Sequence, residues 1–107
     1  MSPSATGLSP AFQLFLEAAP ESARAWLGCV QGLSEANALE PKTRHLAYLA
    51  VLAALRLESG VPFHVQLAKR AGATRAEVVS AILSGLPAAG NAVTQSLPGA
   101  LAAYDAP

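Results

Sequence analysis

Apolar residues recur at helical spacing along most of the chain, usually just after a proline. Ser9 before Pro10 is typical of a helix N-terminus and predicts a helix over about residues 10–18. Pro20 predicts a second helix that ends near residue 37, because its large side chains recur on one helical face. This apolar stripe consists of Ala23, Trp26, Leu27, Val30 and Leu33.

The third predicted helix is apolar on every side. It begins at Pro41 and extends to about residue 58. Between Leu46 and Leu55 the Tyr48 hydroxyl is the only polar side-chain group. We therefore expect this helix to be buried all round, at the centre of the fold.

The two following helices are marked by their ends. Pro62 and Gly72 predict a fourth helix over residues 62–71. Thr74 and Glu77 match a capping box, in which the threonine hydroxyl and the glutamate carboxylate each accept a hydrogen bond from a backbone amide of the first turn. A fifth helix is therefore predicted from residue 74 to about 86.

The C-terminal part of the chain predicts one more helix, over about residues 88–97. Pro98-Gly99 is expected to interrupt it, with a last turn over residues 100–104. No segment shows the alternation of a strand, and 107 residues are enough for one core only. The sequence therefore predicts an all-α fold, a single-domain bundle of about six helices over residues 1–107.

Composition narrows the function classes. Seven Lys and Arg and seven Asp and Glu give a net charge of zero, and the basic residues are scattered, so nucleic acid is not an expected partner. The longest apolar run is too short to span a membrane. A lone cysteine gives no disulfide framework and the first seven residues lack a signal-peptide pattern, so we expect a cytoplasmic protein.

The charged fraction predicts self-association. Only 13% of the residues are charged, whereas 52% are hydrophobic. The charged residues are therefore too few to cover the surface of a monomer. Such a small chain cannot surround the third helix and also bury Phe12, Phe15, Trp26 and Leu97. We expect copies of the chain to cover one another.

Two histidines are the candidate site residues. His45 shares a helix face with Tyr48 and Leu49, and His64 shares one with Leu67 and Ala68. Each could be a core histidine with both ring nitrogens satisfied, or a partly desolvated imidazole that moves protons near pH 7. Two histidines with no carboxylate at ligand spacing fall short of a catalytic zinc site, so no metal and no cofactor are expected.

Two further residues are weaker candidates. Cys29 lies mid-helix without a basic neighbour in sequence, which favours an unreactive thiol that serves as a small hydrophobic residue. Glu58 lies at the end of the predicted third helix, where the helix dipole disfavours a carboxylate. It is either solvated or a supporting residue of the site.

Two segments resemble a known family. Leu39-Glu-Pro-Lys-Thr-Arg-His-Leu46, followed by His64-x3-Ala68-x3-Gly72-Ala-Thr-Arg-x-Glu77, is similar to the signature of the carboxymuconolactone decarboxylase family, which includes alkylhydroperoxidase D-like proteins. The resemblance covers about residues 39–86. It implies the alkylhydroperoxidase D-like fold, a site near His64, and a homo-trimer or a homo-hexamer built from dimers.

The chain departs from the redox branch of this family. That branch carries Cys-x2-Cys-x3-His, and here Leu57 and Gly60 stand at the cysteine positions and His45 at that of the relay glutamate. Dithiol peroxidase activity is therefore not expected. In the decarboxylase branch the cysteines are dispensable and acid/base residues work instead.

Three hypotheses remain at this point. The first is lyase- or isomerase-type acid/base chemistry on a small carboxylated molecule, with His64 and His45 as catalytic residues. The second is a non-catalytic oligomeric binding or scaffold protein of the same fold. The third and weakest is a thiol peroxidase that uses Cys29.

Overall fold

The structure is a computed structural model that describes residues 8–107. Its elements are α2 (Pro10–Ala18), α3 (Pro20–Ala36), α4 (Pro41–Ala54), the 3₁₀ helix η1 (Glu58–Gly60), α5 (Val61–Arg70), α6 (Arg75–Leu83), α7 (Leu86–Ala89), the 3₁₀ helix η2 (Asn91–Ser96) and α8 (Leu97–Asp105). The described residues contain no strand, which confirms the all-α prediction. The expectation of no signal peptide concerns residues 1–7, which lie outside the described residues.

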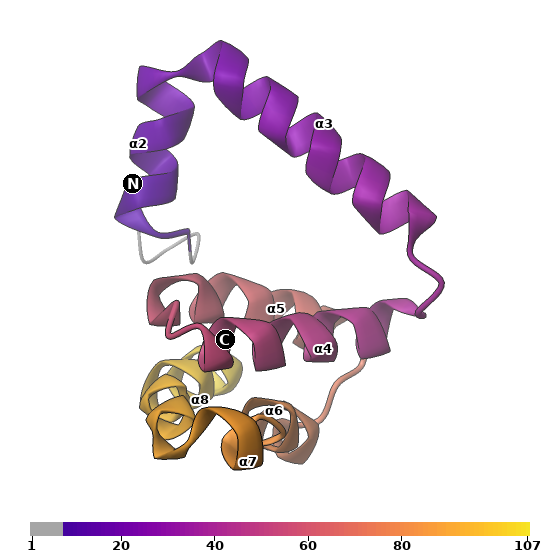
Figure 1. Cartoon of the computed structure of the whole chain (residues 1–107), viewed down its shortest axis with the longest axis vertical. Coiled ribbons are helices and arrows are strands. Elements are labelled where there is room, and N and C mark those ends of the chain that lie inside the picture. Colours follow the sequence, from indigo (N-terminus) through magenta and orange to yellow (C-terminus); the bar gives the residue numbers. More distant parts are fainter. Residues whose placement is uncertain (1–7) are drawn as a thin grey trace.

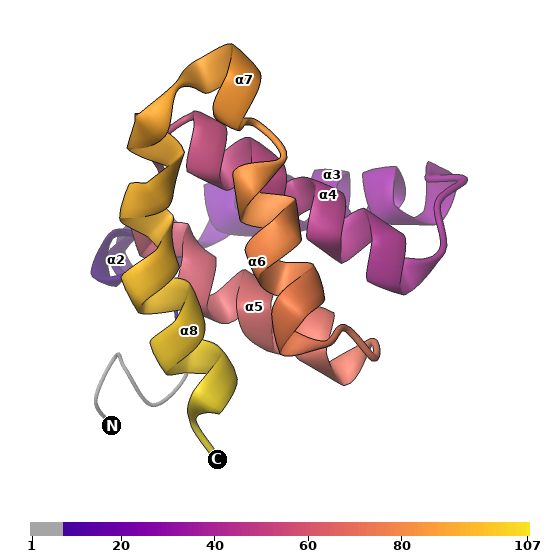
Figure 2. The same cartoon turned by 90° about the horizontal axis from the view of Figure 1, so that it is seen from below.

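The helices form an arm and a bundle (Figure 1). Helices α2 and α3 meet at their junction and diverge from it, and neither packs extensively on the rest of the chain. In the bundle, α4 and α5 form the layer nearest the arm, and α6 and α8 cover their other side (Figures 1 and 2). The side of α4 and α5 that faces the arm is therefore covered neither by a bundle helix nor by close packing of the arm.

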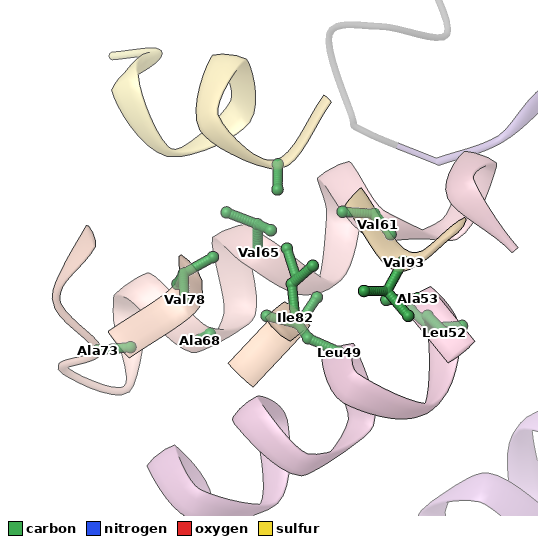
Figure 3. Close-up of a cluster of buried hydrophobic side chains, with 11 residues drawn as sticks. Leu49, Leu52, Ala53, Val61, Val65, Ala68, Ala73, Val78, Ile82 and Val93 are labelled. Atoms are coloured by element: carbon green, nitrogen blue, oxygen red, sulfur yellow. The ribbon is translucent and has the colours of Figure 1, made fainter. Parts of the chain in front are cut away.

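The core lies between the two layers of the bundle. Figure 3 shows its buried side chains, which α4, α5, α6 and η2 contribute in the main. They are almost all aliphatic, so burial of apolar surface is the main force that holds the layers together. The core residues are Leu49, Leu52, Ala53, Val61, Val65, Ala68, Ala73, Val78, Ile82, Val93 and Ala100.

The predicted capping box is confirmed at the start of α6. The Glu77 amide donates to the Thr74 hydroxyl at 3.0 Å, and the Thr74 amide donates to the Glu77 carboxylate at 2.8 Å. The other carboxylate oxygen of Glu77 lies 3.1 Å from the Lys42 ammonium of α4. The cap therefore also joins α6 to α4.

The C-terminal helix is fixed to α5 and α6 by polar contacts. The Gln66 amide donates to the Ala103 carbonyl, and the Lys69 ammonium donates to the Tyr104 carbonyl at 2.6 Å. The Tyr104 hydroxyl donates to the Ala73 carbonyl at 2.8 Å, and Arg75 pairs with Asp105 at 2.9 Å. These contacts hold one face of α5 against α8 and leave the face with His64 toward α4.

The end of the third helix was predicted wrongly. Helix α4 ends at Ala54, four residues before the predicted end, because Arg56 adopts a left-handed conformation with φ 62°. The Arg56 amide donates to the Ala53 carbonyl and the Leu57 amide to the Leu52 carbonyl, the pattern of a Schellman cap. An arginine gives no sequence signal for this stop, since glycine usually occupies the position.

The expected burial of this helix all round is also wrong for the single chain. Leu49, Leu52 and Ala53 are buried, whereas Tyr48 is 46% and Val51 50% exposed. The physical reason is that α5, α6 and the two 3₁₀ helices pack on part of α4, and the arm does not pack extensively on its remaining face.

The sixth helix was predicted wrongly as well. Residues 88–97 form the end of α7 and the 3₁₀ helix η2, and Pro98-Gly99 lies in the first turn of α8 instead of interrupting a helix. Proline is tolerated there because the first-turn amides have no partner within the helix. Among the described residues, no helix is long and apolar enough to cross a membrane.

Candidate functional site

The His64 imidazole packs against Tyr48 at the contact between α5 and α4. The two ring centroids lie 4.4 Å apart, with the ring planes at 52°. The Phe63 ring meets His64 edge-on, with centroids 5.3 Å apart and planes at 90°. His64 thus contacts aromatic rings from two helices, and Tyr48 is itself 46% exposed.

Burial and positive charge lower the pKa values of both histidines. Burial is the larger cause for His64 and the charge of His45 the smaller, and together they lower the pKa of His64 to about 4. Burial also lowers the pKa of His45, with a smaller effect from the charge of Arg44. The structure thus brings the two histidines close enough to interact electrostatically, and both rings are neutral at pH 7.

Neither imidazole makes a hydrogen bond within residues 8–107. A core histidine that serves only packing normally satisfies its ring donor and acceptor, because unpaired buried polar groups are costly. Here the ring nitrogens remain available although the rings are partly buried. The ring nitrogens are themselves open to solvent, because Ser96 Oγ is the only buried side-chain polar atom without a partner among the described residues. They can therefore meet a ligand from solvent.

The other two candidates lie apart from the pair. The Glu58 carboxylate is 3.9 Å from the guanidinium of Arg56, and its charge is not among those that shift the pKa of His64. Cys29 is exposed on α3, so the expectation that it packs as a small hydrophobic residue is wrong within the single chain. It lies off the apolar stripe of a helix that does not pack on the bundle.

Sequence reasoning missed two contributors to the site. Phe63 is not among the predicted site residues, because neighbours in sequence point in different directions on a helix and give no signal for a ring contact. Arg44 is also absent from the predicted site residues, although it is next to His45 in the chain and its charge lowers the pKa of that ring.

Among the described residues no three His, Cys, Asp or Glu side chains form a group that could hold a metal ion.

An open groove lies on another face of the bundle, between α4 and α6. Its volume is about 580 Å³, and neither His45 nor His64 lines it. Alanine and serine side chains form most of its walls, and the Lys42–Glu77 ion pair lies along it. The candidate histidines are therefore on the α5 side of α4 and the groove is on the α6 side.

Comparison with known proteins assigns a family. No curated protein and no solved structure gives a significant match to the chain. The model of the carboxymuconolactone decarboxylase family matches residues 20–103, which extends from the start of α3 into α8 and includes both histidines. The chain therefore belongs to the carboxymuconolactone decarboxylase family.

Proposed function

We propose that the protein binds a small carboxylated molecule at His45 and His64 and moves a proton with His64, in a lyase- or isomerase-type reaction. The observation that supports this proposal is a pair of imidazoles that interact electrostatically with each other. Both are partly buried, and neither makes a hydrogen bond within the described residues. Arg44 lies beside the pair, and its permanent positive charge contributes to the lowered pKa of His45. An anion is the ligand that such surroundings favour.

A bound carboxylate changes the protonation of the site. A negative charge beside an imidazole raises its pKa, so the value of about 4 for His64 moves toward neutral pH when the ligand binds. Binding then takes up a proton from solvent. The neutral ring of the free protein becomes the imidazolium that an acid-catalysed step requires.

The proposed lyase step balances with this one proton. The bond between the carboxylate and its carbon breaks, CO₂ leaves, and the electron pair remains on the carbon. The His64 imidazolium donates its proton to that carbon and returns to the neutral form. In the isomerase version, neutral His64 accepts a proton from a carbon beside a carbonyl and returns it at another carbon. A positioned acid or base of this kind contributes about 10²- to 10⁴-fold.

The experiment is an NMR titration of the two histidines with a five-membered lactone that carries a carboxylate. We expect the His64 ring signals to shift and its pKa to rise, while the uncharged amide of the same lactone has a much smaller effect. Exchange of the ligand's carbon-bound hydrogen in D₂O would report the proton transfer, and His64→Gln should abolish it. If the chemical shifts of both histidine rings stay the same with every carboxylate tested, the non-catalytic scaffold alternative is favoured instead.

The matched control for this experiment is Gln66→His, which places an imidazole elsewhere on α5. Gln66 donates to the Ala103 carbonyl on the α8 side of this helix, away from Tyr48. Its introduced ring should not respond to the lactone. A response there equal to that of His64 would mean that the carboxylate binds histidines without regard to the site.

A further inference from the structure

Arg44 is the only partly buried lysine or arginine without a partner among the described residues. The other two that are partly buried are held in place, Lys42 by the Glu77 carboxylate at 3.1 Å and Lys69 by the Tyr104 carbonyl at 2.6 Å. The other arginines are all exposed. The guanidinium of Arg44 is therefore available to an anion from outside the chain.

The carboxylate nearest to Arg44 along α4 is already engaged. Glu40 precedes Arg44 by one helical turn, a spacing at which an ion pair can form. Its carboxylate instead accepts from the Thr43 amide at 3.0 Å and from the Thr43 hydroxyl at 2.7 Å, as the N-cap of the helix. The hydrogen bonds with Thr43 are the largest causes of the lowered Glu40 pKa, and the charge that adds to them is that of Lys42. No carboxylate of the described residues thus neutralises Arg44.

Arg44 lies beside the ring contact of the candidate site. It precedes Tyr48 by one turn of α4, and residues at this spacing are neighbours on a helix surface. Side chains on a helix lean toward its N-terminus, so Tyr48 leans toward the turn that carries Arg44 and His45. The Tyr48 ring contacts His64 of α5, with centroids 4.4 Å apart. Arg44 and His64 therefore flank the same tyrosine, within reach of one small ligand.

We infer that the Arg44 guanidinium binds the carboxylate of the ligand and keeps it in place, so that the site moves a proton within the ligand and does not release CO₂. The location of the site rests on the proposed function, whereas the lack of a partner for Arg44 does not. A guanidinium binds a carboxylate with two parallel hydrogen bonds, which fix the orientation of the ligand as well as its position.

A carboxylate bound to arginine resists decarboxylation. Its negative charge leaves the carboxyl group as CO₂ forms, so the arginine stabilises the ground state more than the transition state. Hydrogen bonds to a charged group contribute roughly 10- to 100-fold to binding, and CO₂ release is slowed by about that factor. This loss offsets much of the about 10²- to 10⁴-fold that a positioned acid contributes. Proton transfer at another carbon has no such cost, because the carboxylate keeps its charge throughout.

The proton transfer balances without a further reactant. Neutral His64 accepts a proton from a carbon beside the lactone carbonyl, and the electron pair of the broken C–H bond delocalises onto the carbonyl oxygen as an enolate. In an unsaturated lactone, the imidazolium returns the proton to a carbon further along the conjugated system, and the double bond moves. Arg44 offsets part of the charge of the carboxylate, which limits the rise in the His64 pKa on binding and favours the neutral ring that this step needs.

The first test measures how strongly Arg44 binds a carboxylate. The lactone carboxylate and its uncharged amide are titrated by NMR into the wild-type protein and into Arg44→Gln. We expect the dissociation constant of the carboxylate to rise roughly 10- to 100-fold in Arg44→Gln and that of the amide to stay unchanged. Arg44→Lys should recover part of the affinity, because lysine keeps the charge but cannot make the two parallel hydrogen bonds.

The matched control is Arg70→Gln, which removes the same charge from an exposed position at the end of α5. The charge of Arg70 is not among the causes that lower the pKa of His45 or His64. Both dissociation constants should therefore stay unchanged in Arg70→Gln, and circular dichroism should show the wild-type helix content in both variants. Equal weakening of carboxylate binding by Arg70→Gln and Arg44→Gln overturns the inference, because net charge alone then explains the effect.

The second test separates proton transfer from CO₂ release. An unsaturated five-membered lactone with an isotope-labelled carboxylate carbon is incubated with the protein in D₂O. We expect deuterium to enter the ligand faster than with His64→Gln, while the labelled carboxylate is retained. Arg44→Gln should raise the KM of this exchange and leave kcat nearly unchanged, because the carboxylate is bound equally in the ground state and the transition state. Labelled bicarbonate released by the wild-type protein overturns the inference.

The outcomes distinguish this inference from the proposed function. If His64 responds to the carboxylate but Arg44→Gln binds it as tightly as the wild-type protein does, the inference is overturned and the proposed function stands. If Arg44→Gln weakens carboxylate binding while both histidine rings are silent, the binding role of Arg44 is supported. The proposed function then fails, together with the proton transfer that rests on it.

Discussion

The rings of Tyr48 and His64 lie 4.4 Å apart, and this contact makes a residue of α4 responsible for the environment of an imidazole on α5. Burial is the larger of the two causes that lower the pKa of His64 to about 4. Tyr48 covers the ring on the α4 side, so it controls part of this burial. The pair therefore offers a direct test of how the site is built.

Replacing Tyr48 with alanine should raise the pKa of His64 from about 4 toward 6.5, because water reaches the ring when the tyrosine is removed. The measurement is a pH titration of the His64 ring by NMR. Val51→Ala is the control, since it removes apolar atoms from the same exposed side of α4 without a ring contact to His64. An unchanged His64 pKa in Tyr48→Ala would show that other groups exclude the water.

Stability should fall as the pH is lowered from 6.5 toward 4, because of His64. Its pKa is lower in the folded protein than in the unfolded chain, so the unfolded chain binds more protons in this window and acid favours unfolding. His45 acts in the same direction. Glu40, Glu77 and Asp105 also have lowered pKa values. The stability that they contribute is lost at lower pH, when the pH falls below their unfolded pKa values and through their folded ones.

Urea unfolding at pH 7, 6 and 5, at one protein concentration, measures this dependence. His64→Gln should flatten it, leaving the smaller slope that His45 causes. Concentration must be held constant because self-association would itself add to the apparent stability. A slope between pH 7 and 5 that is the same in His64→Gln and in wild type would contradict the low pKa.

The sequence predicted the bounds of α2 and α3 because proline and a capping residue mark helix starts by local chemistry. It did not predict the end of α4, where Arg56 takes a conformation usual for glycine. It predicted the family, which the family model confirms, and it singled out His45 and His64 as candidate site residues, since both inferences depend on residue identity and spacing. It could not predict the contact between Tyr48 and His64 or the exposed face of α4, because both depend on how separate helices cross and on where the arm lies.

Replacing Thr74 with alanine should destabilise the protein by about 1 kcal/mol, the usual cost of losing a side-chain N-cap. The hydroxyl accepts from the Glu77 amide at 3.0 Å, and alanine leaves that amide without this partner. Thermal or urea unfolding measures the effect. Thr94→Ala is the control, because its hydroxyl donates to a carbonyl within η2 and caps no α-helix. Equal stability of Thr74→Ala and wild type would mean that water replaces the cap without cost.

Replacing Cys29 with serine should leave any turnover of the protein unchanged. The thiol is exposed on α3 and is the only cysteine, so no internal dithiol can form. Peroxide reduction with a thiol reductant, and the lactone exchange reaction, should both be compared between Cys29→Ser and wild type. Peroxide turnover that disappears in the folded variant would favour the thiol peroxidase alternative.

Arg56 and Gly72 occupy the same kind of position and should respond to substitution in opposite directions. Each is the left-handed residue of a Schellman cap, with φ 62° after α4 and φ 101° after α5. A residue with a Cβ costs about 1–2 kcal/mol in this conformation. Glycine avoids this cost, but it also raises the entropy of the unfolded chain, which reduces the gain in stability. Arg56→Gly should therefore stabilise the protein by about 0.5–1 kcal/mol, despite the loss of the long contact to Glu58.

Gly72→Ala should destabilise the protein by about 1 kcal/mol for the same reason. A Cβ at this position would meet no other atom within 4 Å, so a clash does not contribute and the backbone conformation alone is tested. Urea unfolding of the two single variants and of the double variant measures both effects. The two caps are on different helix ends, so the changes should add to nearly zero in the double variant. Destabilisation by Arg56→Gly would show that the arginine side chain contributes more at the end of α4 than its strained backbone costs.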